Sequence, residues 1–129
     1  MKYSFFNSRC EHNFTHDIIK LMMIFGISVI VAGAIFLVIA ILLCCGLIGI
    51  LHDYHTTNVK EEDRKKMGLS IGLSMLVGTL GMISSGIVSI VTNDESIIVL
   101  PISLLIIPLI ITIVLSLLFV KKYNGSIFG

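Results

Sequence analysis

Three long apolar runs follow one another along the chain, separated by short polar segments. The runs cover residues 21–51, 69–91 and 97–120, and none of them contains Asp, Glu, Lys, Arg or His. As a helix rising ~1.5 Å per residue, even the shortest run would be about 34 Å long, which exceeds the roughly 30 Å hydrocarbon core of a bilayer. The pattern therefore predicts an all-α integral membrane protein with three transmembrane helices, at about residues 22–46, 68–91 and 97–120.

The first run is too long for a single straight span. As one helix it would measure about 46 Å and would have to tilt beyond the usual limit of about 40° to stay in the hydrocarbon core. Gly46 and Gly49 are the natural places for a break, because glycine weakens a helix interior. We expect the span near residues 24–45, with residues 47–51 in the interface or against a partner helix. Before it, residues 1–20 are polar and fit either a short interfacial helix or a partly ordered tail.

The polar segment 52–67 predicts where the second helix starts. Asn58 followed by Glu61 is typical of a helix N-cap with its reciprocal partner, so the helix should begin near Val59, before the membrane. Two Glu–Lys pairs at i, i+4 spacing would stabilise this start, Glu61 with Lys65 and Glu62 with Lys66. At the other end, the short polar segment 92–96 favours a tight turn, so the second and third helices should form an antiparallel hairpin. The third run contains Pro101 and Pro108, which membrane helices tolerate when neighbours satisfy the freed carbonyls.

Small residues recur along one face of the second predicted helix. At ~100° per residue they fall within an arc of roughly 100°: Ser70, Ser74, Gly78, Gly81, Ser85 and Ser89. The first run carries a similar stripe. In a bilayer such surfaces allow two helix backbones to approach closely. We therefore predict that the first two helices pair through these packing residues, Gly26, Gly33 and Ala40 against Ser74, Gly78, Gly81 and Ser85.

The composition supports a single membrane domain over residues 1–129. The chain is 56% hydrophobic, with a mean hydropathy of +1.04, and a soluble domain of 129 residues cannot hide that much apolar surface. The formal net charge is only +1, and no basic patch is large enough for a polyanion, so nucleic acid is not expected as a partner.

The basic residues predict the orientation. Lys2, Arg9 and Lys20 lie on the side of the N-terminus, and the connection 92–96 adds none. The other side holds the larger set: Lys60, Arg64, Lys65, Lys66, Lys121 and Lys122. Because basic residues of short loops stay in the cytoplasm, we expect an outside or lumenal N-terminus and a cytoplasmic C-terminus.

Few residues are candidates for chemistry. Cys44 and Cys45 would lie at the cytoplasmic interface, where cysteines can be acylated, although they can equally serve as small packing residues. Asn13 begins an Asn-Phe-Thr glycosylation acceptor pattern close to the first span. His52, Asp53 and His55 fit a polar collar at the membrane surface better than a metal site, which needs more ligands. No metal or other cofactor is expected.

The function that this pattern favours is non-enzymatic. No nucleophile elbow, phosphate-binding loop or zinc-protease motif is present, and spans without ionisable residues argue against coupled transport. We expect a small accessory or scaffold subunit that acts through helix packing in the lipid bilayer, either as a homo-oligomer or bound to a larger membrane protein. Two alternatives remain open, a pore-forming or holin-like permeabilising protein and a membrane immunity or regulatory protein.

Overall fold

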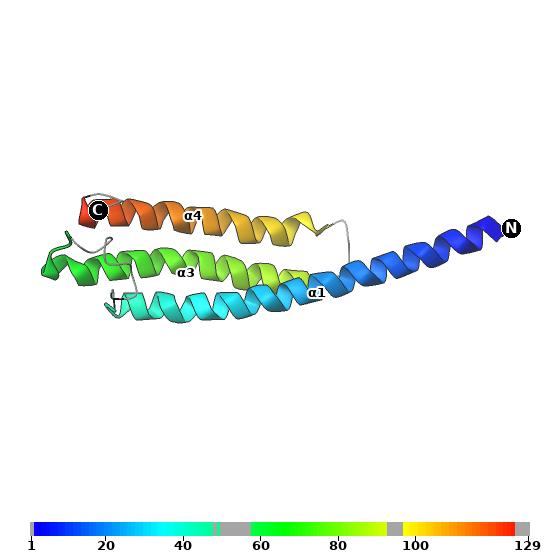
Figure 1. Cartoon of the computed structure of the whole chain (residues 1–129), viewed down its shortest axis with the longest axis horizontal. Helices are drawn as coiled ribbons and strands as arrows, with labels where there is room; N and C mark the ends of the chain where they lie inside the picture. Colours follow the sequence, from blue (N-terminus) through cyan, green and yellow to red (C-terminus); the bar gives the residue numbers. More distant parts are fainter. Residues whose placement is uncertain (1, 48, 50–57, 93–96, 126–129) are drawn as a thin grey trace.

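The described part of the chain consists of three long α-helices and their connections. The computed structural model describes residues 2–47, 49, 58–92 and 97–125 (Figure 1). Within these ranges the chain forms α1 (Lys2–Cys44), α3 (Glu61–Val91) and α4 (Val99–Asn124). The prediction of an all-helical chain is therefore confirmed for this part of the molecule.

Each helix is long and apolar enough to cross a membrane. The candidate spans are His16–Cys44 with 29 residues, Glu61–Val91 with 31 and Val99–Asn124 with 26. Since about 20 apolar residues suffice to span a bilayer, these three helices indicate an integral membrane location. The backbone of residues 2–20 is helical and continues into α1 without a break, so this segment is neither a separate interfacial helix nor a tail.

Glycine ends α1, as its position in the sequence predicts. The helix stops at Cys44, and Gly46 follows in the left-handed region with φ of 89°. The N–H groups of Gly46 and Leu47 donate to carbonyls of the last helical turn at 2.9 and 3.1 Å, the Schellman pattern that satisfies the end of a helix. Residues 48 and 50–51, which the sequence placed in the interface or against a partner, lie outside the described residues.

The start of α3 differs from the prediction. The helix begins at Glu61, and its N-cap is Lys60, with φ −60° and ψ 143° and no side-chain capping bond. Asn58 is not the cap. Instead its backbone N–H donates to the side-chain oxygen of Asn124 in α4 at 3.0 Å, which holds Asn58 ahead of the helix. The predicted capping pair is therefore wrong, and the Asn58 N–H, which would bond to Glu61 in such a pair, bonds to α4 instead.

The ion pairs of the first α3 turns also have a different spacing. Both pairs are i, i+3, Arg64 Nε with Glu61 Oε2 at 3.5 Å and Lys66 Nζ with Asp63 Oδ1 at 3.0 Å. The predicted i, i+4 pairs of Glu61 with Lys65 and of Glu62 with Lys66 are not among the ion pairs of the described residues. The Lys65 stem lies beside Gly46 at the end of α1. These exposed pairs contribute little to stability at either spacing.

Helix α3 lies between α1 and α4 and packs against both (Figure 1). Helix α4 returns along α3, and the N-terminal part of α1 projects beyond the other two helices (Figure 1). The main apolar cluster lies where α1 ends, α3 begins and α4 ends. Its buried members are Leu43, Val59, Met67, Ile71 and Val120.

Candidate functional site: the packing faces of α3

One face of α3, here called the α4-facing surface, holds the buried small residues Ser74, Gly78, Gly81 and Ser85. A Cβ atom added at Gly78 would lie 2.7 Å from Oγ1 of Thr112, and one at Gly81 would lie 2.5 Å from the Pro108 ring and 2.9 Å from the carbonyl oxygen of Leu104. Real Cβ atoms do not come this close. The two glycines therefore set the distance at which α4 packs on α3.

Two hydroxyl groups join α3 and α4 by hydrogen bonds to backbone carbonyls. Oγ1 of Thr112 donates to the carbonyl of Ser74 at 2.9 Å, and Oγ of Ser85 donates to the carbonyl of Pro101 at 2.6 Å. Pro108 has no N–H, so the carbonyl four residues earlier loses its usual partner in the helix. That carbonyl lies against Gly81, where a Cα–H group can face it, a weak but recurrent contact between helices.

A second face of α3, the α1-facing surface, is centred on Gly72 and Gly86. A Cβ at Gly26 of α1 would lie 2.7 Å from the carbonyl oxygen of Gly86, and a Cβ at Gly86 would lie 2.7 Å from the carbonyl oxygen of Gly26. A Cβ at Gly72 would lie 2.7 Å from the carbonyl oxygen of Ala40. Gly33, which is also buried, faces Ile83 and Met82 of α3. The two backbones thus approach closely at both ends of this contact.

The predicted pairing of the two small-residue stripes is wrong. The α1 residues Gly26, Gly33 and Ala40 pack on the α1-facing surface, whereas the predicted partners Ser74, Gly78, Gly81 and Ser85 form the α4-facing surface. At ~100° per residue, Gly72 and Gly86 lie roughly 130° around the helix from that stripe. The sequence also contains the pattern of this second face, because Gly72 and Gly86 lie on one side of the helix. The prediction considered only one stripe of small residues in α3 and missed it.

Three further hydroxyls of α3 bond within their own helix. The side chains of Ser74, Thr79 and Ser89 each donate to the carbonyl four residues earlier, at 2.9 Å. All three residues are buried. Such bonds satisfy polar groups that a bilayer could not solvate.

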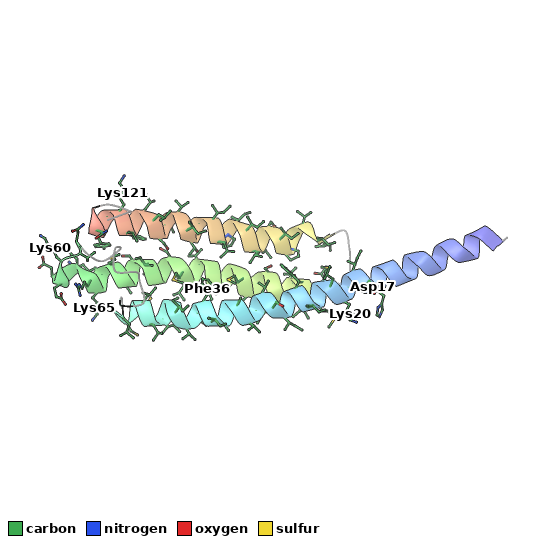
Figure 2. The ribbon with its side chains drawn as sticks, viewed as in Figure 1. Asp17, Lys20, Phe36, Lys60, Lys65 and Lys121 are labelled. Atoms are coloured by element: carbon green, nitrogen blue, oxygen red, sulfur yellow. The ribbon has the colours of Figure 1, made fainter. Side chains whose placement is uncertain are left out.

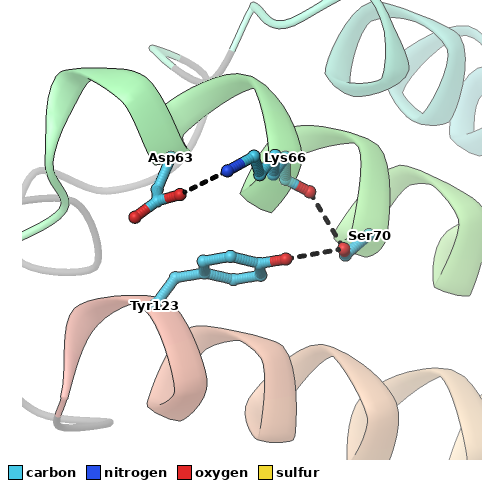
Figure 3. A network of polar contacts seen from close by, with 4 residues as sticks. All are labelled: Asp63, Lys66, Ser70 and Tyr123. Atoms are coloured by element: carbon cyan, nitrogen blue, oxygen red, sulfur yellow. Dashed lines mark hydrogen bonds and ion pairs between the residues drawn. The ribbon is translucent and has the colours of Figure 1, made fainter.

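A polar network joins the start of α3 to the end of α4 (Figure 3). Oγ of Ser70 donates to the Lys66 carbonyl at 2.9 Å and lies 3.5 Å from the hydroxyl of Tyr123. Nζ of Lys66 donates to Asp63 at 3.0 Å, and this hydrogen bond, together with the carboxylate charge, raises the pKa of Lys66. The network lies at the end of the molecule where the basic residues gather.

The two cysteines that are candidates for acylation differ in their exposure. The Cys44 thiol is half-buried beside Gly72, whereas Cys45 is exposed just after the end of α1. Asn13 lies within α1, and its side chain is outside the described part. His52, Asp53 and His55 lie outside the described residues.

Within the described ranges, no group of three or more His, Cys, Asp or Glu side chains could hold a metal ion. Comparisons of the chain with protein-family models, with curated proteins and with solved structures found no match. A function can therefore be inferred from the helix packing, the exposed apolar faces and the charges at the two ends of the molecule.

Proposed function

We propose that the chain is a multi-pass membrane protein in which α1, α3 and α4 each cross the bilayer and α3 and α4 form a tight antiparallel hairpin. The support is the distribution of side chains. Most of the small and hydroxyl residues of α3 are buried between helices, whereas the outer faces of α1 and α4 expose large aliphatic side chains such as Ile35, Val38, Ile107 and Ile113. Exposed faces of this kind suit contact with lipid and not with water.

The proposed orientation has the N-terminus outside or in a lumen and the C-terminus in the cytoplasm. Lys60, Lys65 and Lys121 lie together at one end of the three-helix unit, while Asp17 and Lys20 lie at the other (Figure 2). Basic residues are retained on the cytoplasmic side, so the end with more of them should face the cytoplasm.

The proposed function is that of a non-enzymatic accessory or scaffold subunit. One observation carries it: both small-residue faces of α3 are already occupied, by α1 and by α4, so the chain forms a prepacked unit with apolar outer faces. A second copy of the chain or a larger membrane protein would then bind to the outer faces of α1 or α4. A partner would then contact large aliphatic side chains and not a small-residue surface.

A pore-forming or holin-like role has less support. A pore lined by the uncharged residues 69–91 of α3 would need hydroxyls or carbonyls facing water. The buried hydroxyls of α3 donate instead to carbonyls of α3 or α4. An immunity or regulatory protein would also act through a partner and is compatible with the same surfaces.

The test is crosslinking of the full chain in its native membrane, followed by native mass spectrometry. We expect complexes larger than the monomer, containing either further copies or one larger membrane protein. A monomer under all crosslinking conditions would contradict the proposal. Expression in cells stained with a membrane-potential dye distinguishes a scaffold from a pore-forming protein. An intact potential is expected for a scaffold and a collapsed potential for a pore. The identity of a crosslinked partner would separate a scaffold from an immunity protein.

A further inference from the structure

Charged side chains are arranged in layers at the end of the molecule where α3 begins and α4 ends. The acidic residues described at this end all lie in the first turn of α3: Glu61, Glu62 and Asp63. Five basic residues lie nearer to the apolar runs 69–91 and 97–120: Arg64, Lys65, Lys66, Lys121 and Lys122. One more, Lys60, precedes the acidic turn. Going outward from the apolar runs, one therefore meets a basic layer before an acidic one.

The two layers would lie at different depths if the apolar runs fill the hydrocarbon core of a bilayer. At ~1.5 Å per residue, Lys65 comes about 6 Å before the run 69–91, and Lys121 directly follows the run 97–120. Glu62 comes about 10 Å before the run 69–91. A bilayer of roughly 40–45 Å with a core of about 30 Å has headgroup layers about 5–8 Å thick. The lysines would lie among lipid headgroups, and the carboxylates would lie beyond them.

Three lysines of the basic layer have no carboxylate partner in the described part of the chain. Two other basic residues are occupied, Arg64 by Glu61 at 3.5 Å and Lys66 by Asp63 at 3.0 Å. An ion-paired group must give up its carboxylate before it can contact another anion. The lysines that are exposed and form no ion pair with a described residue are Lys65, Lys121 and Lys122.

Contacts between α3 and α4 hold these lysines at one end of the molecule. The Tyr123 hydroxyl lies 3.5 Å from Oγ of Ser70 (Figure 3), and the Asn58 N–H donates to the side chain of Asn124 at 3.0 Å. Nζ of Lys122 lies 5.3 Å from the centre of the Tyr123 ring. The end of α4 is thereby fixed beside the start of α3, and the lysines of both helices face the same layer of the bilayer.

The order of the charges favours a membrane lipid over a soluble anionic partner. A soluble polyanion that approaches from the water would first meet the three carboxylates of the α3 turn and a single lysine, Lys60. Like charges repel, so this approach is unfavourable. A phospholipid phosphate meets the basic layer at its own depth. The rule that sets orientation counts Lys and Arg and depends little on Asp and Glu, so it does not account for the outer position of the acidic residues.

We propose that Lys65, Lys121 and Lys122 bind the phosphate groups of anionic phospholipids in the leaflet at this end of the molecule. This binding rests on the membrane integration proposed above. A basic residue close to an anionic bilayer surface strengthens binding about fivefold. Anionic lipids would therefore collect around this end in preference to neutral ones.

The test uses the full chain in nanodiscs that contain equal amounts of palmitoyl-oleoyl phosphatidylglycerol and palmitoyl-oleoyl phosphatidylcholine. The chain is released into a mild detergent, and native mass spectrometry gives the ratio of the two lipids that it retains. We expect an excess of phosphatidylglycerol, which Lys121→Gln should lower about fivefold. Lys121→Arg keeps the charge and should retain the excess. Equal retention of the two lipids by the unmodified chain would overturn the proposal.

Lys60 and Lys65 provide a matched pair that differs in depth. Both are exposed lysines at the start of α3 without an ion pair among the described residues, but Lys60 comes about 14 Å before the run 69–91, beyond the headgroup layer. Lys65→Gln should lower the lipid ratio about fivefold, and Lys60→Gln should lower it less than twofold, because salt screens a charge at that distance. Equal losses in the two variants would overturn the proposal, since net charge and not position would then attract the lipid.

The outcomes separate this inference from the proposed function. A chain that alkaline carbonate removes from membranes would contradict membrane integration. A chain that stays in the bilayer but retains both lipids equally would overturn the lipid proposal alone. Binding of soluble polyglutamate to the chain in nanodiscs of pure phosphatidylcholine, with loss of that binding in Lys121→Gln, would also overturn it, because the lysines would then serve an acidic protein. Displacement of phosphatidylglycerol by inorganic phosphate, but not by chloride of equal ionic strength, would overturn it in favour of a site for free phosphate.

Discussion

At the scale of single residues, the packing of the helices depends on glycines whose surroundings leave no room for a side chain. The carbonyl of Leu104 and the ring of Pro108 occupy the space into which a side chain at Gly81 would project. In lipid there is little hydrophobic force between helices, so close packing must supply most of the association. The hydrogen bond from Ser85 to Pro101 adds to this packing, but hydroxyl bonds between membrane helices average only about 0.6 kcal/mol.

Substitution of a packing glycine should therefore be costly. Gly81→Leu places a branched side chain against backbone and a rigid ring, and we expect it to lower the free energy of unfolding by about 3 kcal/mol. The measurement is unfolding by sodium dodecyl sulfate in mixed micelles. Ser84→Leu is the matched control, because Ser84 lies exposed on the same helix, and it should change stability by less than about 0.5 kcal/mol. Equal effects of the two variants would mean that α4 does not pack at Gly81.

Loss of a hydroxyl bond should cost much less than loss of close packing. Ser85→Ala removes the donor to the Pro101 carbonyl but leaves the shape of the interface almost unchanged. We expect a destabilisation of about 0.6 kcal/mol in the same unfolding assay, with Ser84→Ala near zero. A loss for Ser85→Ala as large as that for Gly81→Leu would show that hydrogen bonding, and not packing, dominates this contact.

At the scale of the helices, the ends are fixed by contacts between elements as well as by local caps. Helix α4 ends at Gly125, whose φ of 79° and N–H bond to the Lys121 carbonyl form a left-handed cap. The residue before it, Asn124, is buried and accepts a hydrogen bond from the backbone of Asn58. The end of α4 thereby positions the segment that leads into α3.

Asn124 should accordingly control the order of the segment before α3. Asn124→Leu removes the acceptor for the Asn58 N–H, and a typical hydrogen bond contributes about 1 kcal/mol. We expect the Asn58 amide to exchange its hydrogen about fivefold faster, measured by hydrogen–deuterium exchange. Asn124→Asp keeps an acceptor oxygen and should retain most of the protection. Unchanged exchange in Asn124→Leu would show that this bond does not hold the segment.

Hydropathy alone predicts the helices, and much less of how they meet. The three apolar runs indicate three helices, because each run is long enough to cross a bilayer as a helix. Gly46 indicates the end of α1, because glycine weakens a helix interior. The neighbours of each helix face could not be predicted in the same way. Helix α3 has small residues on two faces, and periodicity does not say whether Gly78 meets α1 or α4. The partner of the Asn58 N–H could not be predicted either, because it is Asn124, more than sixty positions away.

At the scale of the whole molecule, charge is distributed unequally between its two ends. Six basic residues follow the first span or the third, and three precede the first span. Lys60 and Lys65 at the start of α3 and Lys121 near the end of α4 all lie at the same end of the molecule (Figure 2). Basic residues of short loops are usually retained in the cytoplasm, so this charge difference supports the proposed orientation.

Labelling of introduced cysteines should reveal this orientation. In a background with Cys10, Cys44 and Cys45 replaced by serine, we expect Asp94→Cys to react with an impermeant maleimide on intact cells, because the proposed orientation has the connection 92–96 outside the cytoplasm. Lys60→Cys and Lys122→Cys should react only after the membrane is permeabilised. Since orientation follows the basic residues, replacing Lys60, Arg64, Lys65 and Lys66 by glutamine should shift part of the population to the opposite orientation, and Asp94→Cys would then require permeabilisation in that fraction. Reaction of Lys122→Cys on intact cells, in a chain that retains these four basic residues, would contradict the proposed topology. It would not affect the description of how α3 packs against its neighbours.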